Sequence, residues 1–186
     1  MEEKILMKRR QLIILTDIGD TVINEVTEVR KVPFGVVYHA ECIPGAKETL
    51  LALYEQGYTI AMVADGLVRS FHNTMEENGL DHIFSAWVIS EPLHVEKPHS
   101  LMFETAFKEL GLHEEDKPRV IMIGNNLKRD IVGANRFGIT SVWMSWSKRY
   151  SQAPACPEEE PDYTIPEPAM LLPLVEKLES ELEKRS

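Results

Sequence analysis

Short apolar segments alternate with amphipathic segments along almost the whole chain of 186 residues. Several of the short segments are apolar at successive positions, which is typical of strands that are covered on both faces. The segments between them place apolar residues at helical spacing, and such alternation indicates a mostly parallel sheet with helices on both sides. We therefore predict a three-layer α/β, Rossmann-like fold with about five to six strands. The expected strands are Gln11–Thr16, Tyr58–Ala64, Ala86–Ile89, Arg119–Ile123, Thr140–Met144 and Tyr163–Ile165, and the main expected helices are Pro44–Gln56, His99–Leu110, Arg129–Phe137 and Ala169–Lys184.

The length of the chain fits one ordinary domain with a real core and is short for two. We expect a single domain over residues 1–186, with an N-terminal extension at 1–10 and a terminal helix at 169–184. A stretch rich in Pro and Glu at 151–162 is interpreted as a surface loop that leads to the last strand, rather than as a domain linker.

Charge and cysteine content limit the classes of function. The net charge of −10 argues against nucleic acid bound as a general polyanion, because such binding depends on Lys and Arg. The apolar run Leu12–Leu15 is too short for a signal segment or a membrane span, so we expect a cytoplasmic protein without a membrane partner. Cys42 and Cys156 show no metal-type spacing, which favours reduced thiols.

Polar residues follow the expected strands, where open α/β sheets bind their ligands. Asp17 follows the first strand, Asp65 the second, and Asp130 lies shortly after the fourth, while Lys97 precedes a helix. A carboxylate can attack phosphorus, a divalent cation held by carboxylates can orient phosphoryl oxygens, and an ammonium group offsets their charge. Taken singly, Lys97 could be solvated and Asp130 could lie in the first turn of a helix. Their order along the chain favours one common site.

Four motifs carry a resemblance to a known family. They are LIILTDIGDT, YTIAMVADG, Lys97-Pro98 and GNNLKRDIVGANRFG, and PDYTI follows later. In this order and context the chain resembles the haloacid dehalogenase-like (HAD) hydrolase superfamily, of the subfamily I type. The resemblance runs from about Leu12 to about Ile165 and implies the Rossmann-like HAD fold and a phosphatase activity.

The resemblance also implies roles for single residues. Asp17 would be the nucleophile that forms an aspartyl-phosphate, and Lys97 would hold the phosphoryl group and orient Asp17. The implied cofactor is Mg²⁺, and its implied ligands are Asp17, the carbonyl of Gly19, Asn125 and Asp130. The implied substrate-binding residues are Thr21, Ala64, Asp65, Gly66 and Lys97.

Three positions depart from the family pattern. Gly19 stands where the family usually has its general acid/base Asp, and Ala64 replaces a Ser or Thr that donates to phosphate. Asn125 replaces an acid of the metal motif, so the site would bind a hard cation less strongly. Asp20 and Asp65 are candidate substitutes for the missing acid, although Asp20 could equally bond local backbone amides in a turn.

The spacing of the motifs leaves no room for a cap domain. We therefore expect a capless member with an open cleft, and a homo-oligomer is compatible with this. The first hypothesis is a slow or specialised Mg²⁺-dependent phosphatase that acts on a phosphorylated small molecule or a larger phosphorylated substrate. The alternative is a HAD-fold protein that binds a phosphorylated ligand or partner without turnover. A dehalogenase is a third hypothesis, which the metal motif and the missing cap disfavour.

Overall fold

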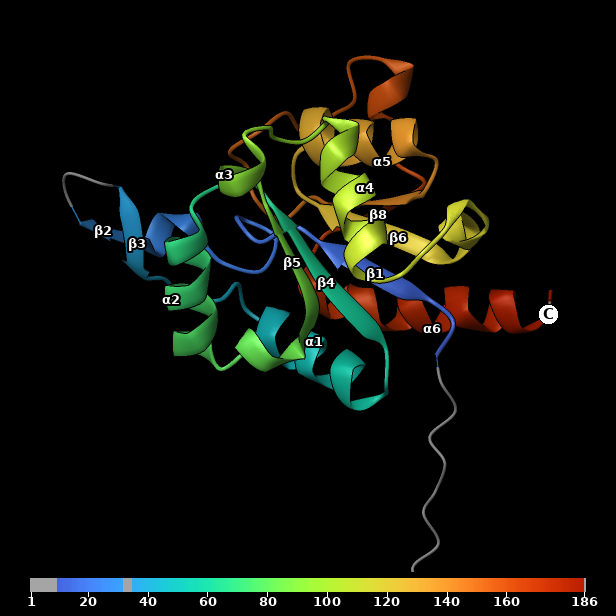
Figure 1. Ribbon diagram of the computed structural model, residues 1–186, viewed down its shortest axis with the longest axis horizontal. Helices are drawn as coiled ribbons and strands as arrows, with labels where there is room; N and C mark the ends of the chain where they lie inside the picture. Colours follow the sequence, from blue (N-terminus) through green and yellow to red (C-terminus); the bar gives the residue numbers. More distant parts are fainter. Residues whose placement is uncertain (1–9, 32–34, 186) are drawn as a thin grey trace, which may run out of the picture.

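A sheet of six parallel strands forms the centre of the molecule, in the order β5-β4-β1-β6-β7-β8 (Figure 1). The computed structural model describes residues 10–31 and 35–185. The predicted α/β fold and its parallel sheet are confirmed, and six strands fall within the expected range. The strands of this sheet are β1 (Ile13–Thr16), β4 (Thr59–Ala64), β5 (Phe84–Ile89), β6 (Val120–Gly124), β7 (Thr140–Met144) and β8 (Tyr163–Ile165).

Six α-helices accompany the sheet in the described residues, and four of them match the main expected helices to within a few residues. The exception in detail is the segment Arg129–Phe137, where the first residues belong to a π-helical turn, Leu127–Ile131, that precedes the α-helix. The helices are α1 (Ala46–Glu55), α2 (Val68–Asn78), α3 (Ser90–Leu93), α4 (Ser100–Glu109), α5 (Val132–Phe137) and α6 (Leu171–Glu183). Short 3-10 turns lie at Glu25–Thr27, Asp81–Ile83, Glu114–Arg119, Pro157–Glu159 and Pro168–Met170.

The helices cover the two faces of the sheet in separate groups (Figure 1). Successive side chains of a strand point to opposite faces, and β1 shows this directly. Ile14 packs into a core cluster that includes α1 and α6, whereas Ile13 and Leu15 pack into a second cluster with α4 and with Ala134 of α5. Burial on both faces explains why the inner strands β4 and β6 read as nearly continuous apolar runs in the sequence.

The strand order reverses beside β1. The chain proceeds from β1 through β4 to β5 on one side, then crosses over and continues with β6 on the other side of β1. Crevices at such switch points, beyond the carboxyl ends of the strands, are the usual ligand sites of open α/β sheets. The amide of Asp17 continues the ladder by donating to the carbonyl of Ile123 at 2.8 Å. Asp17 is therefore fixed at the end of β1, next to the end of β6.

A small hairpin lies in the sequence between β1 and β4, the first two strands of the main sheet. Strands β2 (Val29–Lys31) and β3 (Val36–His39) pair antiparallel, outside the main sheet. The amide of Val37 donates to Ser70 Oγ at 3.0 Å, and Asn73 Nδ2 donates to the carbonyl of Val37 at 2.8 Å. This fastens the hairpin to α2, as Figure 1 also shows. In the described part of the chain between β1 and β4, the other elements are a 3-10 turn and α1, with no domain-sized insertion.

The expected domain organisation stays a prediction. Most of the expected N-terminal extension, residues 1–9, lies outside the described residues. Helix α6 lies within the expected terminal helix, and the Pro- and Glu-rich loop contains the turn Pro157–Glu159.

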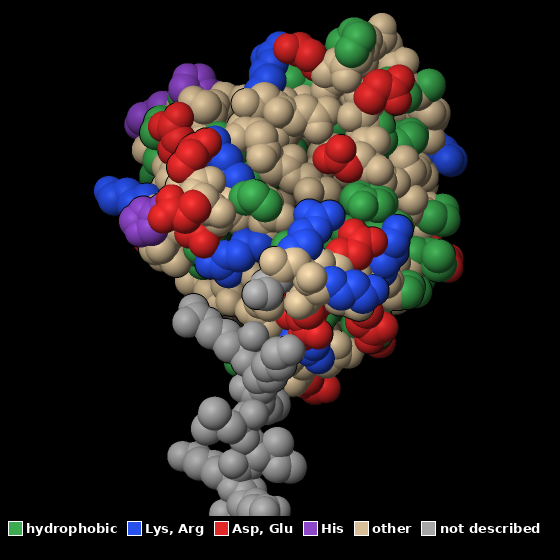
Figure 2. All heavy atoms as spheres, turned by 90° about the vertical axis from the view of Figure 1, so that its right-hand side faces the viewer, with side chains coloured by type: hydrophobic (Ala, Val, Ile, Leu, Met, Phe, Trp, Pro, Cys, Tyr) green, Lys and Arg blue, Asp and Glu red, His purple; other side chains and the backbone are tan. Residues whose placement is uncertain are grey.

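Two surface properties complete the fold. On the face in Figure 2, Lys and Arg side chains lie side by side with Asp and Glu. Among the described residues, none of the helices is long and apolar enough to cross a bilayer.

Candidate active site

A buried lysine joins two carboxylates at the switch point of the sheet. Lys97 Nζ lies 2.6 Å from Asp17 Oδ1 and 2.9 Å from Asp130 Oδ1, and it also donates to the carbonyl of Val63 at 2.6 Å. The side chains of Lys97 and Asp130 are each 1% exposed, and that of Asp17 is 12% exposed. The structure thus brings three of the predicted site residues, from three distant parts of the sequence, into direct contact.

The surroundings set the charge states of this centre. Burial by itself would lower the pKa of Lys97, but the carboxylates of Asp130 and Asp17 outweigh this and raise it, so the ammonium form persists. Burial raises the pKa of Asp130, and Lys97 opposes that shift. The ammonium of Lys97 binds only one carboxylate oxygen of Asp17, Oδ1, so the other oxygen is available to a second donor. That oxygen, Oδ2, accepts a hydrogen bond from Thr21 Oγ1 at 3.1 Å, and the substrate-binding role expected for Thr21 stays a prediction.

The turn after β6 places Asp130. Its Oδ2 accepts from the amide of Asn126 at 2.9 Å. The carboxylate lies directly over Gly124, where an added Cβ would come 2.1 Å from Asp130 Cγ. Glycine at this position is therefore required by the close approach of the acid. The indole of Trp143 donates to the carbonyl of Asn125 at 3.0 Å and ties the turn to β7.

Asp65 lines the hollow at Asp17, and both of its carboxylate oxygens are occupied by protein donors. Its Oδ1 accepts from the backbone amide of Lys97 at 3.0 Å, and its Oδ2 lies 3.3 Å from Arg129 NH1. Ala64 is fully buried, and the amide of Gly66 donates to Ser90 Oγ at 2.9 Å. Of the three consecutive residues predicted to bind substrate, only Asp65 lines the hollow at Asp17. The phosphate cradle expected from this turn stays a prediction.

A second charged cluster lies on the other side of the loop after β1. Asp20 is 1% exposed, and its Oδ1 accepts from the amide of Glu25 at 3.0 Å. Its Oδ2 accepts from Ser147 Oγ at 2.9 Å and lies 3.1 Å from Arg149 Nε. Arg149 also pairs with Glu25 Oε2. Burial raises the pKa of Glu25, while Arg149 opposes that shift. Asp20 thus holds the loop together, as the turn hypothesis for this residue anticipated.

The hollow over Asp17 includes residues that the sequence did not single out. It is lined by Asp17, Asp65, Asn125, Asn126, Arg129, Asp130 and Tyr150. Tyr150 comes from the loop after β7, and its neighbour Arg149 lies outside the lining and pairs with Asp20 and Glu25. Only the position of Tyr150 in the sequence could have pointed to it. It lies shortly after a strand of the sheet, and other strands of that sheet are followed by polar site residues. Nothing in the local pattern singled out Glu25.

The oxygen-rich donor set fits a hard divalent cation. Asp130 Oδ1 lies in ion-pair distance of Lys97 but accepts no hydrogen bond, which leaves a buried carboxylate oxygen with bonding capacity. Asn125 Nδ2 is likewise buried without a hydrogen bond. Mg²⁺ favours one or two carboxylates together with carbonyl oxygens, water and substrate phosphate, which matches Asp17, Asp130 and the amide oxygen of Asn125 at the hollow. Among the described residues, no group of three or more His, Cys, Asp or Glu side chains could hold a metal ion, so a cation at Asp17 would depend on two carboxylates together with carbonyl or amide oxygens.

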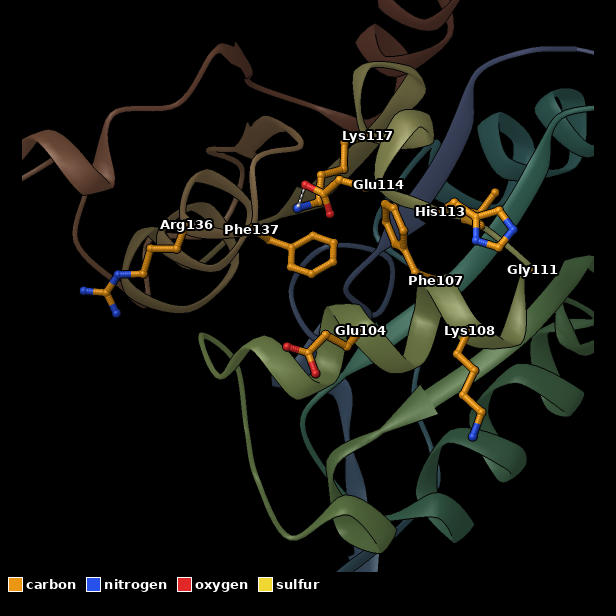
Figure 3. A pocket seen from close by; sticks show the side chains of 10 residues that line it. Glu104, Phe107, Lys108, Gly111, His113, Glu114, Lys117, Arg136 and Phe137 are labelled. Atoms are coloured by element: carbon orange, nitrogen blue, oxygen red, sulfur yellow. Dashed lines mark hydrogen bonds and ion pairs between the residues drawn. The ribbon is translucent and has the colours of Figure 1, made fainter.

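A larger hollow lies elsewhere in the described residues. It has a volume of about 670 Å³ and is lined by α4, the 3-10 turn Glu114–Arg119 and α5 (Figure 3). Phe107 and Phe137 belong to its apolar part, while Glu104, Lys108 and Arg136 point away from the two rings (Figure 3). It contains none of the residues at the carboxyl ends of the strands. The chemistry therefore points to the much smaller hollow at Asp17, because only that one gathers carboxylates around a buried ammonium.

A parallel sheet with an acid–lysine–acid centre at its switch point defines a class of hydrolase, and sequence comparison places the chain in it. Residues 10–144 match the haloacid dehalogenase-like hydrolase family, and the chain belongs to this family. It is 33% identical over 135 residues to the glyceraldehyde 3-phosphate phosphatase of Methanopyrus kandleri, covering 73% of this chain and 57% of that protein. It is 27% identical to the phosphoglycolate phosphatase of Haemophilus influenzae over 158 residues, covering 84% and 68%.

Solved structures show the same fold. A HAD hydrolase from Bacillus subtilis, crystallised with bound magnesium, superposes with a TM-score of 0.73 at 18% identity, covering 90% of this chain and 99% of that chain. The chain spans just over half the length of the first curated relatives that it matches. The predicted family and fold are confirmed.

Proposed function

We propose that the protein is a phosphatase that hydrolyses a phosphorylated small molecule through an aspartyl-phosphate on Asp17. The observation that carries the proposal is the orientation of Asp17. Lys97 Nζ contacts one of its carboxylate oxygens at 2.6 Å, and Thr21 Oγ1 contacts the other at 3.1 Å. A carboxylate held in one orientation at the mouth of a hollow, with a fixed positive charge beside it, is arranged for nucleophilic attack.

Lys97 has two roles in this reaction. It holds Asp17 in place before the substrate arrives, and its charge stabilises the negative charge on the phosphoryl oxygens during transfer. Asp65 supports it by accepting a hydrogen bond from its backbone amide at 3.0 Å. Release of the leaving group produces the aspartyl-phosphate, and attack of water on phosphorus then returns the free carboxylate.

Charge balance supports a requirement for Mg²⁺. Asp17, Asp130 and Lys97 together carry two negative charges and one positive charge, so the buried centre has a formal charge of −1. A phosphate dianion would be repelled by such a centre unless a cation accompanies it. Asp17, the carbonyl of Gly19, Asp130 and Asn125 would hold the ion. When bound, it supplies positive charge that neutralises and orients the phosphoryl oxygens.

The substrate class follows from the relatives and from the rim of the site. The relatives named above are phosphatases of small phosphorylated molecules by name. Arg129 lies at the rim of the hollow, is 43% exposed, and pairs with Asp65 and Glu96. We propose that it meets the anionic part of the substrate beyond the phosphate.

The test is a panel of phosphoesters assayed for phosphate release with and without Mg²⁺, with Asp17→Asn as the comparison variant. We expect metal-dependent release by the wild type and none by the variant, because an amide does not displace the leaving group. Equal release from both proteins would refute Asp17 as the nucleophile. Ligand-dependent thermal stabilisation without any product would favour the alternative, a protein that binds a phosphorylated ligand without turnover. Halide release without added metal would favour a dehalogenase.

A further inference from the structure

Residue 19, where the family usually has its acid/base Asp, is a glycine in this protein, and the side chain of Glu25 fills the adjacent space. An ideal Cβ built on Gly19 would lie 2.0 Å from Glu25 Oε1, and its three nearest heavy atoms all belong to the Glu25 side chain. The carboxylate of Glu25 therefore occupies the volume into which a side chain at residue 19 would extend. Gly19 and Glu25 are complementary, since a larger residue at 19 would displace the glutamate.

We propose that Glu25 is the general acid/base of this protein and delivers from the 3-10 turn the carboxylate that the first loop lacks. The inference rests on the phosphatase function proposed above and assigns a further residue to the same site. It differs from the substitutes considered from the sequence, Asp20 and Asp65. Both carboxyl oxygens of each of those residues contact protein donors.

The backbone around Glu25 is fixed, which is what a residue in this role requires. The amide of Glu25 donates to Asp20 Oδ1 at 3.0 Å. The turn itself begins at Asn24, whose side chain accepts from the amide of Val26 at 3.2 Å. Thr27 closes it by donating through Oγ1 to the carbonyl of Asn24 at 2.7 Å, and the same oxygen accepts from the amide of Glu41 at 2.8 Å.

The two oxygens of Glu25 have different surroundings. Oε2 pairs with Arg149, whereas Oε1 is the oxygen nearest the Gly19 position. Arg149 is shared, because its Nε lies 3.1 Å from Asp20 Oδ2. It therefore retains a carboxylate partner when Glu25 is protonated and when it is ionised. Glu25 can alternate between the two forms without leaving Arg149 unpaired.

The proposed proton transfers are balanced over the two half-reactions. In the first, Asp17 attacks phosphorus, the bond from phosphorus to the leaving oxygen breaks, and the proton of Glu25 passes to that oxygen. In the second, the Glu25 carboxylate takes a proton from water, the water oxygen attacks phosphorus, and the bond to Asp17 breaks. The products are the free alcohol and inorganic phosphate, and Glu25 regains its proton.

The test compares two substrates whose leaving groups differ in their need for a proton. Glycerol 3-phosphate releases an alkoxide that must be protonated, whereas p-nitrophenyl phosphate releases a stable phenolate. We expect Glu25→Gln to lower kcat on glycerol 3-phosphate by about 10²–10⁴-fold, the usual contribution of a general acid/base. With p-nitrophenyl phosphate the variant should give a rapid burst of nitrophenolate and then stall as the phosphorylated enzyme, which mass spectrometry detects on Asp17. The matched control is Glu28→Gln on the same segment, which should behave like the wild type.

A second variant separates chemistry from folding. In Gly19→Asp combined with Glu25→Ala, the carboxylate returns to the family position after its obstruction is removed, and the double variant should regain at least tenfold over Glu25→Ala alone on glycerol 3-phosphate. Activity of Glu25→Gln within threefold of the wild type on glycerol 3-phosphate, or absence of rescue in the double variant, would overturn the acid/base role of Glu25. Either result would leave the proposed phosphatase function standing. Absence of hydrolysis by the wild type on both substrates would overturn the proposed phosphatase together with this inference.

Discussion

Replacing Lys97 with Met should destabilise the metal-free protein strongly, because the lysine offsets two buried acids. The side chains of Lys97 and Asp130 are each 1% exposed, so solvent does not screen their interaction. The substitution keeps the volume but leaves Asp130 as a buried charge without its cation, and the carbonyl of Val63 loses its donor. Removing one partner of a buried pair costs about 3–5 kcal/mol. That is a large part of the total stability of an average domain, about 5–15 kcal/mol.

The assay is urea unfolding in the presence of a chelator, together with a thermal melt. For a chain of this length a loss of that size lowers Tm by roughly 6–20 °C. Adding Asp130→Asn to the Lys97 variant should restore part of the loss, because it removes the unpaired charge. The surface control is Lys177→Met, whose side chain is 60% exposed and which should change stability by no more than about 0.5 kcal/mol. A loss below about 1 kcal/mol for Lys97→Met, the size typical of exposed pairs, would refute the argument.

Three further predictions concern other parts of the fold. Glu179→Ala should lose about 1–3 kcal/mol in urea unfolding, because its carboxylate accepts from two backbone amides at the start of β1, whereas the exposed Glu176→Ala should be neutral. Gly133→Ala should lower stability by about 1–3 kcal/mol in the same assay, since the added methyl would lie 2.6 Å from an aromatic ring of α4. Burial raises the pKa of Cys42 to about 11, so at pH 8 only about one molecule in a thousand carries its thiolate. Iodoacetamide should therefore label the exposed Cys156 first, with labelling of Cys42 rising about tenfold per pH unit between 8 and 10; equal rates by mass spectrometry would contradict this.

The elements that the sequence predicted best are those whose packing leaves a local pattern. Thr140–Met144 and Tyr163–Ile165 agree with β7 and β8 at both ends. Strand β7 is buried at four of its five positions, as a strand covered on both faces should be, whereas β8 is a short edge strand whose Thr164 is exposed. The helix expected at Arg129–Phe137 was less well placed, since the turn before it winds more widely to bring Asp130 over Gly124. A requirement of the site, rather than of helix propensity, set that boundary.

The acid–lysine–acid part of the site was predictable for a related reason. Asp17 and Asp130 follow strands, and parallel strands end at the same edge, so their approach follows from topology. The approach of Glu25 to Gly19 does not, because it depends on the conformation of the loop between them, and its approach to Arg149 depends on how two loops 124 residues apart pack together. Loop packing of this kind leaves no periodic signal, and the sequence therefore directed attention to Asp20, the nearest acid in the chain.

The position of β1 in the middle of the sheet has a consequence for how the chain is made. Both neighbours of β1 are synthesised after it, and one of them, β6, begins about a hundred residues later at Val120. The backbone amides of Gln11 and Leu12, just before β1, donate to Glu179, a residue far along the chain in α6. Pairing across such separations is slow, because the entropy cost of closing the loop precedes the stabilising contacts between the strands. During translation the strand that ends just before Asp17 therefore leaves the ribosome before the other strands of the main sheet, and its apolar side chains stay uncovered until β6 has followed.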